Sequence, residues 1–172
     1  MRRFLRIEDV EVIKPFDCGD TALNSFLMED SRFFFDEFIA NTFVYEDDNE
    51  TLAYFSLLND KVSNTTIPKN IWRKLRSEIP HEKHFSSYPA VKIGRLAVAK
   101  NHQGENIGSN LIRLIREMLL RRASVSACRF ITVDAVVDKR SFYEKNGFRL
   151  LQNEIPEGAE TVLMYFDLKT FG

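Results

Sequence analysis

The chain has 172 residues, of which 24 are Lys or Arg and 25 are Asp or Glu, so its formal net charge is −1. With 44% hydrophobic residues, 7 Gly and 5 Pro, the composition excludes a disordered chain, a collagen and a disulfide-bonded mini-protein. A nearly neutral chain also lacks the overall positive charge that attracts nucleic acid, although a local basic face is compatible with this total. We expect one globular domain over residues 1–172.

The cysteines and the N-terminus indicate a cellular compartment. Cys18 and Cys128 are too few for a disulfide framework and lack the spacing of a zinc site, so free thiols in a reducing compartment are expected. Charged residues interrupt the first apolar run, and no later stretch reaches membrane-spanning length. The sequence therefore predicts a cytoplasmic protein without a membrane partner.

The N-terminal third of the chain predicts a strand, a helical region and a hairpin. The strand is expected over residues 5–13. Large apolar residues recur at spacings of three, four and seven over residues 21–38, which is typical of one or two short helices, and Asp20 is a suitable N-cap. Residues 42–46 and 51–58 are β-branched or aromatic runs on either side of an acidic turn, which predicts an antiparallel hairpin.

The middle of the chain predicts two helices on either side of a buried strand. Residues 59–68 are polar and are expected to form a loose segment. Pro68 then begins a helix over residues 69–78, because proline suits the first turn of a helix. The apolar run at 90–99 indicates a buried strand, and the helical spacing of Ile, Leu and Met over residues 107–119 predicts a long amphipathic helix.

The C-terminal part predicts strands with one short helix among them. The helix is expected over residues 138–146, ended by Gly147. Strands are expected at 128–137, 148–151 and 161–168. The whole order of strands and intercalated helices predicts an α/β or α+β fold on a mixed sheet.

A glycine-containing loop lies between the buried strand and the long helix. It reads Gln103-Gly104-Glu105-Asn106-Ile107-Gly108-Ser109. Such a turn directs unpaired backbone N–H groups and the positive end of the helix dipole toward one point, so a phosphate-bearing ligand is expected there. The loop matches neither a nucleotide-triphosphate P-loop nor the G-x-G-x-x-G fingerprint, which disfavours ATP and NAD. The alternative is an ordinary helix start with a glycine turn.

Two motifs resemble a known family. Leu96-Ala97-Val98 followed by Gln103-x-x-Asn106-x-Gly108-Ser109 resembles the acetyl-coenzyme A signature of GNAT-type N-acetyltransferases, Gln/Arg-x-x-Gly-x-Gly/Ala. The chain departs from that signature at Asn106. Asn tolerates a left-handed backbone better than other non-glycine residues, so the turn is expected to form, and a weaker hold on the pyrophosphate is the alternative.

The second motif, Ser141-Phe142-Tyr143-Glu144-Lys145-Asn146-Gly147-Phe148, resembles the family's Phe-Tyr-Glu-Lys-x-Gly-Phe segment. The resemblance to the family covers about residues 90–151. The resemblance implies a single GNAT-like domain with a mixed, mostly antiparallel central sheet flanked by helices. It also implies a splay between the strand that ends at Val98 and the next strand, near Asp134.

The resemblance implies that acetyl-coenzyme A is the cosubstrate and that no metal is needed. Backbone groups of Leu96 and Val98 would hold the acetyl group and the pantetheine arm, and the loop amides would hold the pyrophosphate. The residues expected at the cofactor are Leu96, Ala97, Val98, Gln103, Gly104, Asn106, Ile107, Gly108, Ser109 and Phe142.

Tyr143 is the expected general acid. An amine attacks the thioester through a tetrahedral intermediate, and the leaving thiolate benefits from a proton. A phenol with a pKa near ~10 is protonated at neutral pH and donates within hydrogen-bond reach, while backbone N–H groups at the splay would form the oxyanion site. The alternative role of Tyr143 is a core aromatic beside Phe142.

The general base is left open, because no spacing links a candidate to Tyr143. An unassisted amine or a chain of waters is equally compatible with the sequence. The side chains considered are Glu46, Asp134, His81, His84 and His102.

The N-terminal segment 16–27 and Arg95, in Ile93-Gly94-Arg95-Leu96-Ala97-Val98, resemble the toxin-type GNAT branch that acetylates the amino group of aminoacyl-tRNA. An enzyme that binds tRNA needs a basic face, and ten cations of the chain could supply one. The alternative is that these cations only lie on solvent-exposed helix faces and bind no RNA. The candidate cations are Arg73, Lys74, Arg76, Lys92, Arg95, Lys100, Arg113, Arg116, Arg121 and Arg122.

The expected function is therefore acetyl transfer from acetyl-coenzyme A to a primary amine. The more specific prediction is that this amine belongs to aminoacyl-tRNA. A small-amine or protein-amine acetyltransferase and a catalytically inactive coenzyme A binding module are the alternatives. The expected partners are the amine acceptor, a second copy in a homodimer and an antitoxin-like protein.

Overall fold

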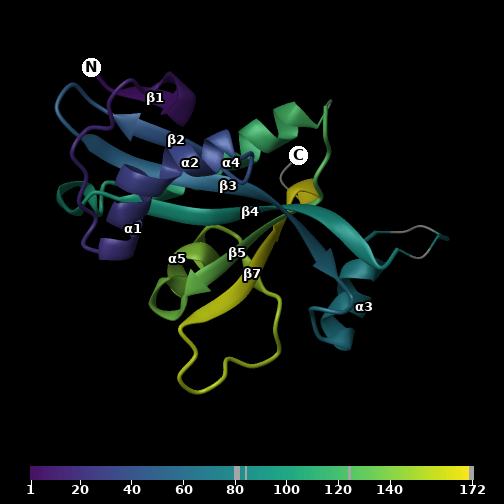
Figure 1. Cartoon of the computed structure of the whole chain (residues 1–172). Helices are drawn as coiled ribbons and strands as arrows, with labels where there is room; N and C mark the ends of the chain where they lie inside the picture. Colours follow the sequence, from purple (N-terminus) through teal and green to yellow (C-terminus); the bar gives the residue numbers. More distant parts are fainter. Residues whose placement is uncertain (80–81, 84, 124, 171–172) are drawn as a thin grey trace. The chain divides into compact units, whose positions relative to one another are not determined.

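The computed structural model describes residues 1–79, 82–83, 85–123 and 125–170. Its seven-stranded sheet has the order β1-β2-β3-β4-β5-β7-β6, and the pairs β1/β2, β2/β3, β5/β7 and β6/β7 are antiparallel (Figure 1). This confirms the predicted mixed, mostly antiparallel sheet with helices. The chain forms two compact units: unit 1 is Met1–Leu58 with Ile93–Ile115, and unit 2 is Asn59–Lys92 with Arg116–Gly172. The single domain over residues 1–172 stays a prediction.

Unit 1 contains the N-terminal helices and a β-hairpin. Asp20 caps the first helix as predicted, because its Oδ1 accepts a hydrogen bond from Leu23 N at 3.0 Å. A π-helical turn, Phe26–Asp30, joins the first two helices. The elements that lie wholly in unit 1 are β1 (Arg3–Arg6), α1 (Thr21–Ser25), α2 (Ser31–Asp36) and β2 (Asn41–Glu46).

Three elements contain residues of both units, and the core of unit 1 uses two of them. They are β3 (Thr51–Ser63), β4 (Ser87–Val98) and α4 (Ile107–Arg122). Phe26 and Leu27 of the helical region pack with Val44 of β2, Tyr54 of β3 and Ala97 of β4 in one buried cluster. The helical region therefore covers the β2–β3 hairpin with its apolar side.

Unit 2 is built around a second cluster. Pro68 begins its first helix as predicted, and Trp72 and Leu75 of that helix pack with Tyr88, Phe130 and others in the cluster. Its elements are α3 (Lys69–Ser77), β5 (Phe130–Val136), α5 (Arg140–Lys145), β6 (Arg149–Leu150) and β7 (Thr161–Asp167).

Two expected boundaries are wrong. The first strand ends at Arg6, because Ile7 and Val10 bury their side chains at a spacing of three, which suits the 3-10 turn Ile7–Asp9 rather than a strand. Part of the expected loose segment belongs to β3. Asp60 is satisfied inside the sheet, since its Oδ2 accepts a hydrogen bond from Thr132 Oγ1 at 2.5 Å.

No helix formed by the described residues has the length and apolarity that crossing a bilayer requires.

Candidate active site

The loop before α4 has the backbone of an anion-binding turn. Gly104 has φ +90° and Asn106 has φ +61°, so the predicted left-handed conformation of Asn106 is confirmed. Asn106 O accepts the first helical hydrogen bond from Asn110 N at 3.0 Å, so α4 begins directly after Asn106. A Cβ placed on Gly104 meets no atom within 4 Å, which leaves open space over the loop. The helix start and this open space fit a phosphate-bearing ligand.

Gln103 holds this loop in place. Its Nε2 donates to Val98 O at 3.0 Å and to Cys18 O at 3.1 Å, so one side chain joins the loop to the end of β4 and to the N-terminal segment. The end of β4 is itself anchored, because Ala99 N donates to Leu52 O at 2.8 Å. Ala97 is buried in the core of unit 1, whereas Leu96 and Val98 are half-buried. Contacts of these residues with acetyl-coenzyme A stay predictions.

His102 connects the same loop to the start of β3. Its Nε2 lies 3.1 Å from Glu50 Oε1 and its Nδ1 lies 3.1 Å from Glu105 Oε1. The hydrogen bond with Glu50, reinforced by Glu105, raises the pKa of His102 above its usual range. His102 is therefore a structural bridge, and no motif or spacing in the sequence reveals this role.

We expect this bridge to make the stability of unit 1 depend on pH. Because the pKa of His102 is higher in the folded state than in the unfolded state, its imidazolium stabilises the fold fully below pH about 6.5 and loses that effect as the pH rises through the folded-state pKa. In thermal unfolding, a His102→Gln variant should therefore fall further below the wild type in acid than near pH ~9. An equal difference at both pH values contradicts the bridge.

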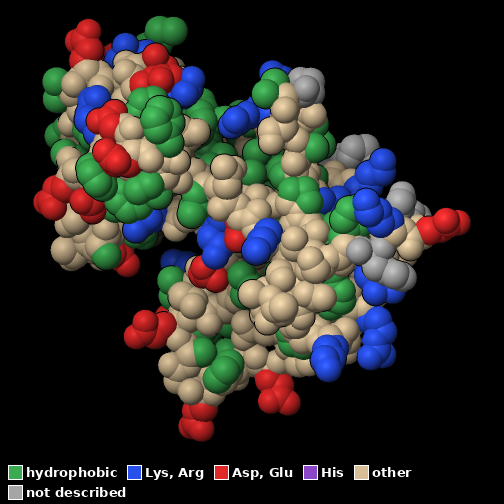
Figure 2. All heavy atoms as spheres, turned by 45° about the vertical axis from the view of Figure 1, so that its right-hand side comes forward, with side chains coloured by type: hydrophobic (Ala, Val, Ile, Leu, Met, Phe, Trp, Pro, Cys, Tyr) green, Lys and Arg blue, Asp and Glu red, His purple; other side chains and the backbone are tan. Residues whose placement is uncertain are grey.

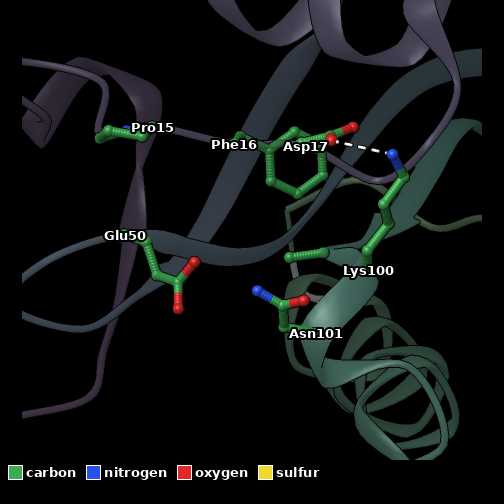
Figure 3. A pocket seen from close by; sticks show the side chains of 7 residues that line it. Pro15, Phe16, Asp17, Glu50, Lys100 and Asn101 are labelled. Carbon is green, nitrogen blue, oxygen red and sulfur yellow. Dashed lines mark hydrogen bonds and ion pairs between the residues drawn. The ribbon is translucent and has the colours of Figure 1, made fainter.

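A cavity of about 240 Å³ opens in unit 1 at residues that directly follow β4 (Figure 3). Lys100 Nζ forms an ion pair with Asp17 Oδ2 at 3.0 Å on its rim. That lysine, with Asn24 and the Gly19 amide, lowers the pKa of Asp17 to about 2. The lining comes from three separate segments, so no sequence motif signals it: Pro15, Phe16, Asp17, Glu50, Ala99, Lys100 and Asn101.

Tyr143 lies on α5 in unit 2. Its side chain is 7% exposed and contacts Phe142 and Phe148 edge-on, with ring centroids 5.1 Å and 5.4 Å away. Burial raises the pKa of Tyr143 to about 12, so the phenol is protonated throughout the neutral range. Among the described residues its hydroxyl has no hydrogen-bond partner, which leaves its proton available to a ligand.

Two further candidate side chains, Arg95 and Asp134, are each held by a neighbouring side chain. Arg95 stacks its guanidinium on Phe26, with Cζ 3.7 Å from the ring centroid. Asp134 Oδ2 forms an ion pair with Lys92 Nζ at 2.8 Å, so this carboxylate already has a partner. His81 and His84 lie outside the described residues.

Glu46 is held by two cations in unit 1. Its Oε1 accepts hydrogen bonds from Arg3 Nη2 and Lys14 Nζ, both at 2.9 Å, and its Oε2 is buried without a partner. An acceptor amine has no route to a buried oxygen, so this environment argues against Glu46 as the base.

Both cysteines are free thiols, as predicted. Burial raises the pKa of the Cys18 thiol and of the Cys128 thiol, so neither carries the thiolate that a nucleophile needs. Within the part of the chain that the structure describes, no three His, Cys, Asp or Glu side chains gather as a set that would hold a metal ion.

Known proteins resemble this chain in sequence and in fold. The tRNA-acetylating toxin of Mycobacterium tuberculosis is 24% identical over 146 residues, which cover 84% of this chain and 82% of that protein. A Tyr-to-Phe mutant of KacT superposes with a TM-score of 0.80 at 23% identity, over 98% of this chain and 96% of that one. AtaT complexed with acetyl-methionyl-tRNAfMet gives a TM-score of 0.79 at 20% identity, over 99% and 97%. AtaT is also known bound to the C-terminus of the antitoxin AtaR.

A family model matches the part of the chain that carries these features. The model of the acetyltransferase (GNAT) domain covers residues 39–150, which include the end of β4, the loop, α4 and Tyr143. The chain therefore belongs to the GNAT acetyltransferase family and is an N-acetyltransferase that uses acetyl-coenzyme A.

Proposed function

We propose that this enzyme acetylates the amino group of aminoacyl-tRNA, with Tyr143 as the general acid. The observation that carries the proposal is the likeness, over 84% of the chain, to a curated tRNA-acetylating toxin. The acetyl group is supplied by the thioester of acetyl-coenzyme A. The loop between Gln103 and Ser109 holds the pyrophosphate, and the buried, protonated phenol of Tyr143 gives its proton to the departing thiolate.

The distribution of cations supports a nucleic-acid acceptor. Four of the ten candidate cations are engaged by neighbours: Lys92 by Asp134, Lys100 by Asp17, Arg95 by Phe26 and Arg116 by Phe166. The six others are exposed, namely Arg73, Lys74, Arg76, Arg113, Arg121 and Arg122.

Three of the exposed cations lie on α3. Because Ile71 and Leu75 pack that helix into the core of unit 2, its basic side faces solvent, and Figure 2 shows Lys and Arg side chains over this region. An exposed basic helix is the footprint that tRNA phosphates require.

The direct test is transfer of labelled acetyl from acetyl-coenzyme A to bulk aminoacylated tRNA, with the same tRNA deacylated as the control. Label on charged tRNA alone supports the proposal. Thiol release with polyamines or protein amino groups, but no label on tRNA, assigns the enzyme to small-amine or protein-amine acceptors and refutes the tRNA assignment. Binding of acetyl-coenzyme A without thiol release from any amine would show that the protein is a catalytically inactive coenzyme A binding module.

Charge reversal on α3 tests the tRNA face. The variant Arg73→Glu, Lys74→Glu and Arg76→Glu is expected to raise KM for aminoacyl-tRNA about tenfold or more at low salt, because each cation contributes to phosphate binding, while kcat stays within a factor of about two. Lys169→Glu, an exposed lysine near the end of β7, is the matched control and should leave KM unchanged. An unchanged KM in the triple variant removes α3 from the tRNA face.

The same likeness bears on protein partners. AtaT is bound by an antitoxin C-terminus, and we propose that an antitoxin-like protein binds this chain as well. A homodimer stays a prediction.

A further inference from the structure

Helix α2 ends in a Schellman motif whose left-handed position is occupied by a phenylalanine. Ile39 N donates to Phe34 O at 2.9 Å and Phe38 N donates to Phe35 O at 3.0 Å, which are the two hydrogen bonds of this motif. Phe38 has φ +57° between them. Glycine usually occupies this position because any Cβ is strained there, so the chain holds an aromatic residue at a place where it costs stability.

Phe38 also gains nothing from packing, because its side chain is 97% exposed. Three further large apolar side chains within residues 28–39 are exposed: Met28 by 44%, Phe33 by 57% and Ile39 by 47%. Two other phenylalanines of the helical region, Phe26 and Phe34, pack into the core of unit 1. The exposed residues of segment 28–39, which we call the α2 face, therefore include large apolar side chains that do not serve the core.

Acidic residues lie beside these apolar residues in the sequence. Glu29, Asp30, Asp36 and Glu37 are exposed, and none of them forms an ion pair with another described residue. The one cation of the segment, Arg32, is turned away, since its Nη2 donates to Val10 O and to Glu11 O. Figure 2 shows hydrophobic side chains next to acidic ones in this part of the molecule.

We propose that the α2 face binds a short basic protein segment that carries large apolar side chains. The exposed aromatics supply the apolar contact, and the four carboxylates supply charge complementarity. The same carboxylates disfavour the other occupants. They repel RNA phosphates and anionic lipid headgroups, and a second copy docked by this face would bring a second set of the same charges.

A substitution of Phe38 can separate the loss of binding from the loss of folding, because Phe38 is both exposed and strained. Phe38→Gly removes the apolar side chain and also relieves the left-handed backbone, so it should weaken partner binding while raising the midpoint of thermal unfolding. A loss of binding therefore cannot come from a loss of folding. Phe85→Ser changes an aromatic residue in unit 2 that is 45% exposed and is the matched control.

The probes are labelled helical peptides of defined composition, measured by fluorescence anisotropy with the full chain. A peptide of Leu and Lys should bind the wild type and the Phe85→Ser variant equally, and the Phe38→Gly variant about tenfold more weakly. A Ser and Lys peptide of the same charge should bind the wild type weakly, because it lacks the apolar side chains.

A charge swap tests the electrostatic part. Changing Glu29, Asp30, Asp36 and Glu37 to Lys should transfer binding from the Leu and Lys peptide to a Leu and Glu peptide. The proposal is overturned if Phe38→Gly binds like the wild type, or if the charge-swapped variant keeps its preference. It is also overturned if sedimentation shows a dimer that Phe38→Gly converts to a monomer, which assigns the face to a second copy. None of these readouts depends on acetyl transfer, so they stand apart from the tRNA assay.

Discussion

Replacing Tyr143 by Phe is expected to slow turnover about tenfold or more while the affinity for acetyl-coenzyme A stays unchanged, because the variant loses only the proton donor. The ring remains, so its edge-on contacts with Phe142 and Phe148 persist. Burial raises the pKa of Tyr143 to about 12, so the donor form is present over the neutral range and its loss should be equally large at each pH there. Thiol release from acetyl-coenzyme A measures the rate, and calorimetry measures the affinity.

Tyr88→Phe is the matched control for this change. Tyr88 is another buried tyrosine of unit 2, 8% exposed, and it stacks on Trp72 in the core. Its variant should turn over at the wild-type rate. If Tyr143→Phe also keeps that rate, Tyr143 is a core aromatic and takes no part in the chemistry.

The second large effect is expected at Asn106. Its φ of +61° is tolerated by Gly and Asn but strains a β-branched residue, so Asn106→Val should distort the loop and raise the Kd for acetyl-coenzyme A about tenfold, which corresponds to ~1.4 kcal/mol. Asn106→Gly restores the residue that the family signature carries. It should bind acetyl-coenzyme A at least as tightly as the wild type.

Asn110→Val controls for the effect of valine near the start of α4. Asn110 is exposed inside the helix, and only its backbone N–H bonds to Asn106 O, so the control should keep the wild-type Kd. Equal Kd values for Asn106→Val and the wild type would mean that the cofactor does not use this loop. A higher Kd for Asn106→Gly than for the wild type would show that the Asn side chain itself contacts the ligand.

Elements with a local signal were predictable from the sequence. The hairpin of β2 and β3 follows from two β-branched runs around an acidic turn, and α4 follows from its apolar spacing. The left-handed Asn106 follows from the tolerance of its own side chain. The end of β3 was missed because Asp60 finds its partner in Thr132, a residue far away along the chain.

Features that join distant segments had no such signal. The bridge from His102 to Glu50 spans 52 positions, and the hydrogen bond from Gln103 to Cys18 spans 85. From the sequence, His102 was considered only as one possible base, and the family resemblance placed Gln103 among the cofactor contacts. Neither line of reasoning showed that these two side chains hold the loop in place. Phe38 was similarly hidden, because an apolar residue at helical spacing predicts burial.

The path of the chain through its two units limits when the enzyme becomes complete during synthesis. The chain leaves unit 1 after Leu58, returns at Ile93 and leaves again after Ile115. Unit 1 therefore lacks part of its own chain until residue 115 has been made, and the core of unit 2 lacks Tyr165 until β7 has left the ribosome. A nascent or truncated chain that stops before β7 already holds both family motifs, yet the core of its unit 2 is unfinished. Acetyl transfer should accordingly begin only after β7 has been made.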